Sequence, residues 1–82
     1  MRIELRERFG DRPIRTVATA RLRDDGTIEV VGEPTNVDFL SNFRVHDVQA
    51  DRWVSKEEDP RLWLELIPGH IRSPFRWAEA LD

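Results

Sequence analysis

The stretch RIELRERFGDRPIRTVATARLRDDGTIEVV, residues 2–31, decides the fold. Its first eight residues alternate between charged and apolar side chains, which is typical of a strand with one buried face. The alternation assigns Ile3, Leu5 and Phe9 to the buried face, with Glu7 as a charged exception. We therefore predict that the chain opens with a half-buried β-strand.

Two further strands follow, each after a short turn. Residues 14–22 alternate again, with Arg15 and Arg21 on the outward face and an apolar set on the other: Ile14, Ala18, Ala20 and Leu22. The turn Asp24-Asp25-Gly26 fits a short hairpin, because glycine readily takes a positive φ. Residues 27–31 then form a third strand. Three strands joined by short loops predict an antiparallel β-meander.

The second half of the chain predicts two short helices. Apolar side chains recur at helical spacing over residues 36–43, after a threonine suited to the N-cap. An aspartate cap and a proline at the first helical position begin the second helix, over residues 60–67. Pro68-Gly69 is expected to end it, and Leu64 lies off its apolar face. Trp63 lies on that apolar face and is expected in the core.

Two segments allow more than one structure. Residues 44–54 favour a short hairpin around Ala50-Asp51, with an irregular loop as the alternative. Residues 75–81 fit either a last strand or a short helix in which Trp77 and Leu81 pair. We favour the strand, because a three-stranded meander has two open edges that need covering. The predicted fold class is α+β: a small antiparallel β-meander of three or four strands with two short helices packed on one face.

Length and composition limit the class of protein. A chain of 82 residues is expected to form one compact domain, residues 1–82, with a thin core. There is no cysteine for a disulfide or a thiolate site. No apolar run approaches the roughly 18 residues of a membrane span, and the start lacks a signal-peptide core. We therefore expect a soluble, cytoplasmic protein that does not act at a membrane.

Charge is unevenly distributed along the chain. The net charge is −3, and 12 of the 13 basic residues are arginine. Residues 1–23 carry seven arginines against three carboxylates, and the remainder of the chain is acidic. The acidic total gives no general case for nucleic-acid binding. The asymmetry instead favours charge complementarity, either within the fold or between subunits.

The residues with catalytic chemistry are few. His46-Asp47 and His70 are the candidates for a metal site, but they match no metal motif. Neighbouring residues of a strand also face opposite ways, which argues against His46 and Asp47 sharing an ion. No glycine-rich phosphate loop or nucleophile elbow is present. We predict no catalytic residue, no cofactor and no metal site, and keep a small metal-dependent enzyme as the least favoured alternative.

Arginines and aromatic residues provide the candidate interaction surface. The tail places Arg72, Arg76 and Trp77 around Ser73-Pro74-Phe75, and tryptophan and arginine are enriched at binding hot spots. With the outward strand arginines and one further tryptophan, the predicted surface comprises Arg6, Arg8, Arg15, Arg21, Trp53, Arg72, Phe75, Arg76 and Trp77. The sequence does not decide whether the tryptophans at 53 and 77 are buried or exposed.

The favoured function is a non-catalytic binding protein, either a protein–protein interaction module or a subunit of a larger assembly. Its partner would be another protein or a second copy of the chain. The alternative is a small nucleic-acid-associated regulator that uses the arginine-rich sheet face. That alternative is weakened because Glu4 lies among the outward arginines and the N-terminal strands offer no outward-facing aromatic side chains for base stacking.

Overall fold

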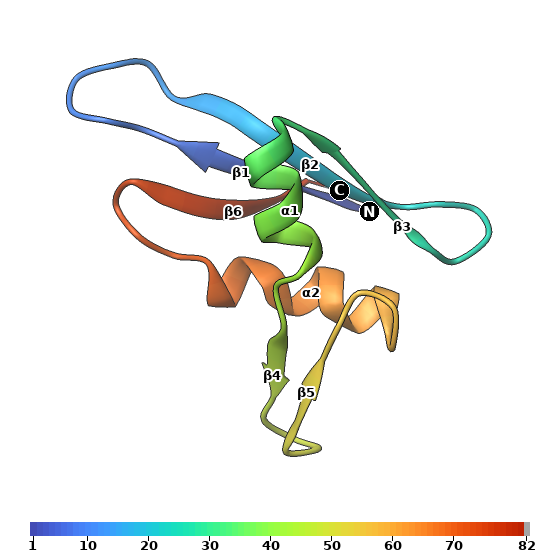
Figure 1. Cartoon of the computed structure of the whole chain (residues 1–82). Coiled ribbons are helices and arrows are strands. Elements are labelled where there is room, and N and C mark those ends of the chain that lie inside the picture. The colour runs from blue at the N-terminus through green and yellow to red at the C-terminus, as the bar shows by residue number, and fades with distance from the viewer. Residues whose placement is uncertain (82) are drawn as a thin grey trace.

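The computed structural model describes residues 1–81 and confirms the predicted α+β fold class (Figure 1). A four-stranded antiparallel sheet carries both helices on one side, and a separate two-stranded hairpin lies beyond them (Figure 1). In chain order the elements are β1 (Arg2–Glu7), β2 (Arg15–Leu22), β3 (Ile28–Gly32), α1 (Pro34–Ser41), β4 (Val45–Asp47), β5 (Arg52–Val54), α2 (Pro60–His70) and β6 (Arg76–Leu81).

The sheet has the strand order β3-β2-β1-β6. The first three strands form the predicted meander. β6 returns after both helices and pairs antiparallel with β1, so the first strand of the chain becomes a central strand of the sheet. Of the two structures open for residues 75–81, the strand is therefore confirmed. It covers the β1 edge of the meander and brings the two ends of the chain side by side (Figure 1).

A β-bulge in β2 changes which side chains reach the core. Leu5 of β1 lies opposite Ala18, but Arg6 lies opposite Thr16, so Val17 is an extra residue. Both Val17 and Ala18 are buried. Alternation along β2 therefore reverses face at the bulge.

Three predictions about the β1–β2 end of the sheet were wrong. Because the bulge reverses the alternation, Arg15 lies opposite Glu7 on the helix-covered face, where it pairs with Glu33 at the start of α1. For the same reason Ile14 leaves the core and is 50% exposed. Phe9 is 54% exposed, because β1 already ends at Glu7.

Helix α1 begins two residues earlier than predicted. Glu33 is its N-cap residue and Pro34 takes the first helical position, so the expected cap, Thr35, lies inside the helix. Proline suits that position because its fixed φ is already helical and its missing N–H would have had no helical partner. The helix ends at Ser41, and the Asn42 N–H caps it by bonding the Asp38 carbonyl at 3.1 Å.

Helix α2 supplies the centre of the core. Its predicted start is confirmed: the Asp59 carboxylate accepts from the Leu62 N–H, and a proline follows the cap. Its predicted end was wrong, because the helix continues through Pro68 to His70. Proline at that position removes only one hydrogen-bond donor near the end of the helix. Trp63 is fully buried, as predicted, and its indole N–H donates to the Phe43 carbonyl at 2.8 Å.

Leu64 is also fully buried, contrary to the expectation that it lies off the apolar face. The reason is that α2 packs against the sheet on one side and against β4 on another. The hairpin predicted for residues 44–54 is confirmed as β4 and β5. It buries Val45 and Val54 in the core and extends away from the sheet (Figure 1).

Candidate interaction surface

Arg76 and Glu7 form an ion pair on the helix-covered face of the sheet. Two guanidinium nitrogens of Arg76 donate to one Glu7 oxygen at 3.1 and 2.9 Å. One of them also donates to Asn36 of α1 at 2.6 Å, and the guanidinium lies 4.7 Å from the centroid of the Phe39 ring. Glu7 is 9% exposed and Asn36 is 6% exposed. Glu7 thus breaks the apolar alternation of β1 because it binds Arg76, and Arg76 links β1, β6 and α1 while part of its side chain remains in solvent.

The opposite, outer face of the sheet presents Trp77 between arginines. Residues paired across antiparallel strands lie on the same face, and Trp77 is paired with Arg6 of β1. An isolated bridge pairs Trp77 with Arg72 on its other side. The guanidinium carbon of Arg8 lies 6.0 Å from the centroid of the Trp77 ring. Phe75 adjoins them, since its carbonyl accepts from the Arg8 N–H at 2.9 Å. We name these five residues the Trp77 cluster.

Exposure within the Trp77 cluster is high for a set that includes two aromatic rings. Phe75 is 59% exposed, Arg8 and Arg72 are exposed, and Trp77 is half-buried. The Trp77 ring therefore rests on the sheet with part of its surface in solvent. Exposed aromatic area next to guanidinium groups is typical of a contact surface.

The arginines of the outer face differ in whether they have carboxylate partners. Arg6 donates to Glu4 at 2.7 Å and also pairs with Glu79. The hydrogen bond from Arg6 lowers the pKa of Glu4, and the same bond raises the pKa of Arg6. Within residues 1–81, no carboxylate lies within 4 Å of the guanidinium of Arg8 or Arg72. Two guanidinium groups beside Trp77 therefore have charge available for a ligand.

The outer face as a whole is not uniformly basic, contrary to the expectation from alternation. At its other end, the Arg21 Nε donates to Glu29 at 2.6 Å, and this bond lowers the pKa of Glu29. Apart from Glu4, the carboxylates that pair with the arginines of β1 and β2 come from the acidic remainder of the chain: Glu29, Glu33 and Glu79. Much of the charge asymmetry seen in the sequence is therefore matched within the fold.

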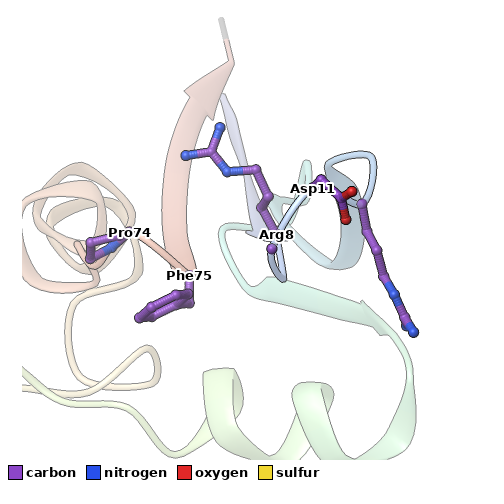
Figure 2. A pocket seen from close by; sticks show the side chains of 6 residues that line it. Arg8, Asp11, Pro74 and Phe75 are labelled. Carbon is purple, nitrogen blue, oxygen red and sulfur yellow. The ribbon is translucent and has the colours of Figure 1, made fainter.

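Two open hollows flank the Pro74-Phe75 turn. One, of about 420 Å³, is lined by Arg8, Gly10, Asp11, Arg12, Pro74 and Phe75 (Figure 2). Figure 2 shows the Arg8 side chain extending toward β6 and away from Asp11. The other, of about 410 Å³, is lined by Pro68, Arg72, Ser73, Pro74, Trp77 and Ala78. Because the charged groups do not converge on one point, these hollows suit an extended contact rather than a small enclosed ligand.

The remaining predicted surface residues lie apart from the Trp77 cluster. Trp53 is on the hairpin, 60% exposed, with its ring tilted 41° to that of His46 at a centroid distance of 5.0 Å. Arg15 of β2 pairs with Glu33 at the start of α1, and Arg76 faces α1. Arg21 lies at the far end of the outer face. Sequence reasoning missed Pro68, which lines a hollow beside Trp77; its place inside α2 was hidden because proline was taken as a helix stop.

The two histidines meet at the junction of the hairpin and α2. The His46 N–H donates to Nε2 of His70 at 3.1 Å, and Nδ1 of His70 lies 2.9 Å from the Leu66 carbonyl. Nε2 of His46 lies 3.2 Å from Asp51. Both ring nitrogens of His70 thus contact backbone groups. Residues 1–81 hold no group of three or more His, Cys, Asp or Glu side chains placed to bind a metal ion.

No protein-family model, curated protein or solved structure matched this chain. Among residues 1–81, neither helix combines the length and the apolar character needed to cross a membrane. The surface chemistry of the sheet is therefore the ground on which a function can be argued.

Proposed function

We propose that this chain is a non-catalytic protein-interaction module that binds an acidic segment of a partner protein through the Trp77 cluster. The observation that carries the proposal is that Trp77, partly exposed, lies beside Arg8 and Arg72, neither of which has a carboxylate partner in the described chain. Tryptophan and arginine together are the residues most enriched at binding hot spots. We further propose a cytoplasmic location, which suits a chain without cysteine.

An acidic peptide fits the Trp77 cluster better than a nucleic acid does. Glu79 and Glu4 lie on the same face, within reach of Arg6. A phosphate backbone carries a charge at every nucleotide and would meet these carboxylates, whereas a peptide can place its acidic side chains at two points. An apolar side chain of the peptide would then rest against Trp77 or Phe75.

The hollows beside the Trp77 cluster support binding rather than catalysis. Their charged lining consists of arginines and a single carboxylate, Asp11. Arginine stays protonated in proteins, so it cannot act as a general base at neutral pH. A hydrolytic carboxylate pair would need a second carboxylate in the same hollow, and a nucleophile would need a base within hydrogen-bond reach.

The test begins with affinity capture of the tagged chain from its native cells, followed by measurement with the purified partner. Arg72→Glu should weaken that complex by at least about tenfold, the range of a hot-spot arginine. Arg61→Glu is the matched control, because Arg61 is exposed on α2 and also has no carboxylate within 4 Å in the described chain. Hydrogen exchange should map the contact on the partner to an acidic segment.

The nucleic-acid alternative is examined with labelled single-stranded DNA and RNA at low salt. Tight binding that falls steeply with salt and is lost in Arg72→Glu would replace the protein partner by a nucleic acid. Equal affinity of the Arg72→Glu and Arg61→Glu proteins for the purified partner would remove the Trp77 cluster from the interface.

A further inference from the structure

The two edges of the four-stranded sheet differ in how far other residues of the chain cover their backbone groups. At the β6 edge, the Ala78 N–H donates to the Ile71 carbonyl, and the Arg76 carbonyl accepts from the Ser73 N–H, both at 2.9 Å. Residues 71–73 therefore cover the first half of this edge. The β3 edge has no comparable cover in residues 1–81, and Val31 beside it is 52% exposed.

The backbone of β3 shows which of its groups point outward. The Arg23 N–H donates to the Thr27 carbonyl at 2.8 Å, and the Glu33 N–H donates to the Val17 carbonyl at 3.0 Å. Residues that bond to β2 therefore have odd numbers, and the N–H and C=O groups of Ile28, Val30 and Gly32 point away from it. In the described chain these six groups have no hydrogen-bond partner.

Proteins normally protect an open edge with lysine, proline, a bulge or a covering loop. Within β3 there is neither lysine nor proline. The strand is interrupted only at its end, where Gly32 has a φ of +144° and Pro34 begins α1. Its single charged side chain, Glu29, is already paired with Arg21. An edge with paired-strand geometry, exposed valine and unpaired backbone groups is a template for another strand.

We propose that β3 pairs antiparallel with β3 of a second copy of this chain, about a twofold axis at Val30. In that register Val30 lies opposite Val30, and Ile28 lies opposite Gly32. The three outward residues of each strand then exchange about six backbone hydrogen bonds. On the outer face, Val31 of each copy lies against Glu29 of the other, and the exposed area of Val31 is covered.

The sequence of β3 favours this register over its neighbours. A shift of two residues in one direction places Glu29 opposite Glu29. A shift in the other direction places Glu29 opposite Glu33, and brings Pro34, which lacks an N–H, opposite Ile28. Glu29 is ionised at neutral pH, as an ordinary glutamate is, and its hydrogen bond with Arg21 lowers its pKa further. Like charges directly opposite are destabilising, so only the register centred on Val30 is free of conflict.

The resulting dimer has one continuous eight-stranded sheet with the helices of both copies on the same side. Because β6 is the strand farthest from β3, the two Trp77 clusters lie at the two ends of this sheet. The dimer is independent of the proposed function, since it uses the other edge of the sheet. It adds that one assembly would present two copies of the Trp77 cluster.

The experiment is sedimentation velocity of the full chain from about 10 μM to about 1 mM, where weak and moderate interfaces dissociate. The expected result is a species of twice the 9.7 kDa chain mass that dissociates on dilution. Val31→Lys should lower the dissociation constant about tenfold and Val31→Glu should raise it about tenfold. Each dimer contains two contacts between position 31 and Glu29, and both are attractive in Val31→Lys and both repulsive in Val31→Glu.

Val48→Lys and Val48→Glu are the matched controls, because Val48 is also an exposed valine, 79% exposed on the hairpin turn. Both should leave the dissociation constant unchanged. Circular dichroism should show all four variants folded, since both valine side chains face solvent. A monomer over the whole concentration range overturns the proposal. So does a dimer in which the two Val31 variants shift the same way, or in which the Val48 variants shift at all, because the contact would then lie elsewhere.

Discussion

Replacing Glu7 by alanine should destabilise this fold far more than replacing a carboxylate on the outer face. The substitution leaves the Arg76 guanidinium between β1 and α1 without its anion. Arg76 would lose two charged hydrogen bonds while keeping its bond to Asn36 and its contact with Phe39. Removing one partner of a buried ion pair costs about 3–5 kcal/mol because the remaining charge is uncompensated.

The expected cost for Glu7→Ala is lower than that range, because the Arg76 side chain is 33% exposed and water can reach it. We expect a loss of about 2 kcal/mol in the free energy of unfolding. For a domain of this size, that corresponds to a fall in Tm of roughly 8–16 °C. The control is Glu79→Ala, which breaks a more exposed pair with Arg6 and should cost at most about 1 kcal/mol.

Urea unfolding followed by tryptophan fluorescence measures both values, because the core Trp63 reports on the whole fold. A double-mutant cycle with Arg76→Met gives the coupling energy between positions 7 and 76. The double variant should recover much of the loss, since methionine needs no anion and can pack against Phe39. The reasoning is refuted if Glu7→Ala and Glu79→Ala lower the free energy of unfolding equally, or if the cycle shows no coupling. In either case the Glu7–Arg76 ion pair does not hold β1 and β6 against α1.

Four further predictions concern stability. Gly32→Ala should destabilise by about 2 kcal/mol or more in urea unfolding, because its φ is +144° and a Cβ would lie 2.4 Å from a backbone oxygen of β2. Gly69→Ala, in α2 with no atom within 4 Å of the added carbon, should instead stabilise by roughly 0.5–1 kcal/mol; a loss there would show that the last turn is not helical in solution. Leu64→Ala should cost about 3 kcal/mol, whereas a cost below about 1 kcal/mol would mean that α2 is not covered on its second side. Thermal melts should show stability falling as the pH drops below the ordinary carboxyl pKa of about 4.3, because the pKa of Glu29, like those of Glu4, Asp25 and Glu58, is lowered in the folded state, so the unfolded chain binds these protons first. Arg21→Gln should flatten that dependence, and an unchanged profile would contradict the role of this pair.

Local patterns predicted most of the secondary structure, and the bulge is the main element they could not predict. Alternation in residues 2–22 and the glycine turn at 24–26 were sufficient for the meander. Val17 and Ala18 are adjacent, apolar and compatible with either face of a strand, so the sequence carried no sign that both are buried. One extra residue reverses every side chain beyond it, which explains why Arg15 and Ile14 were assigned to the wrong faces.

The candidate surface was predicted in composition but not in arrangement. Arg76 and Trp77 are neighbours in sequence, yet once they lie in a strand they must face opposite sides of the sheet. Arg72 joins Trp77 only through a bridge formed after the chain turns at residues 73–75. Glu7 was the useful signal: a charged residue at a core position implies a buried partner, but the sequence alone cannot say that the partner is Arg76, 69 residues away.

The pairing of Arg2 with Leu81 joins β1 to β6, the strand of this sheet that is synthesised last. Until β6 emerges from the ribosome, β1 forms an edge of the nascent meander, with one row of its N–H and C=O groups facing solvent. The pairing of β1 with β6 also closes the longest loop in the sheet, so it is the strand contact with the largest entropic barrier in folding. A translation pause near residue 75 would therefore leave β1 as an unpaired edge strand, and the pairing of β6 ends the exposure of that edge to misassembly.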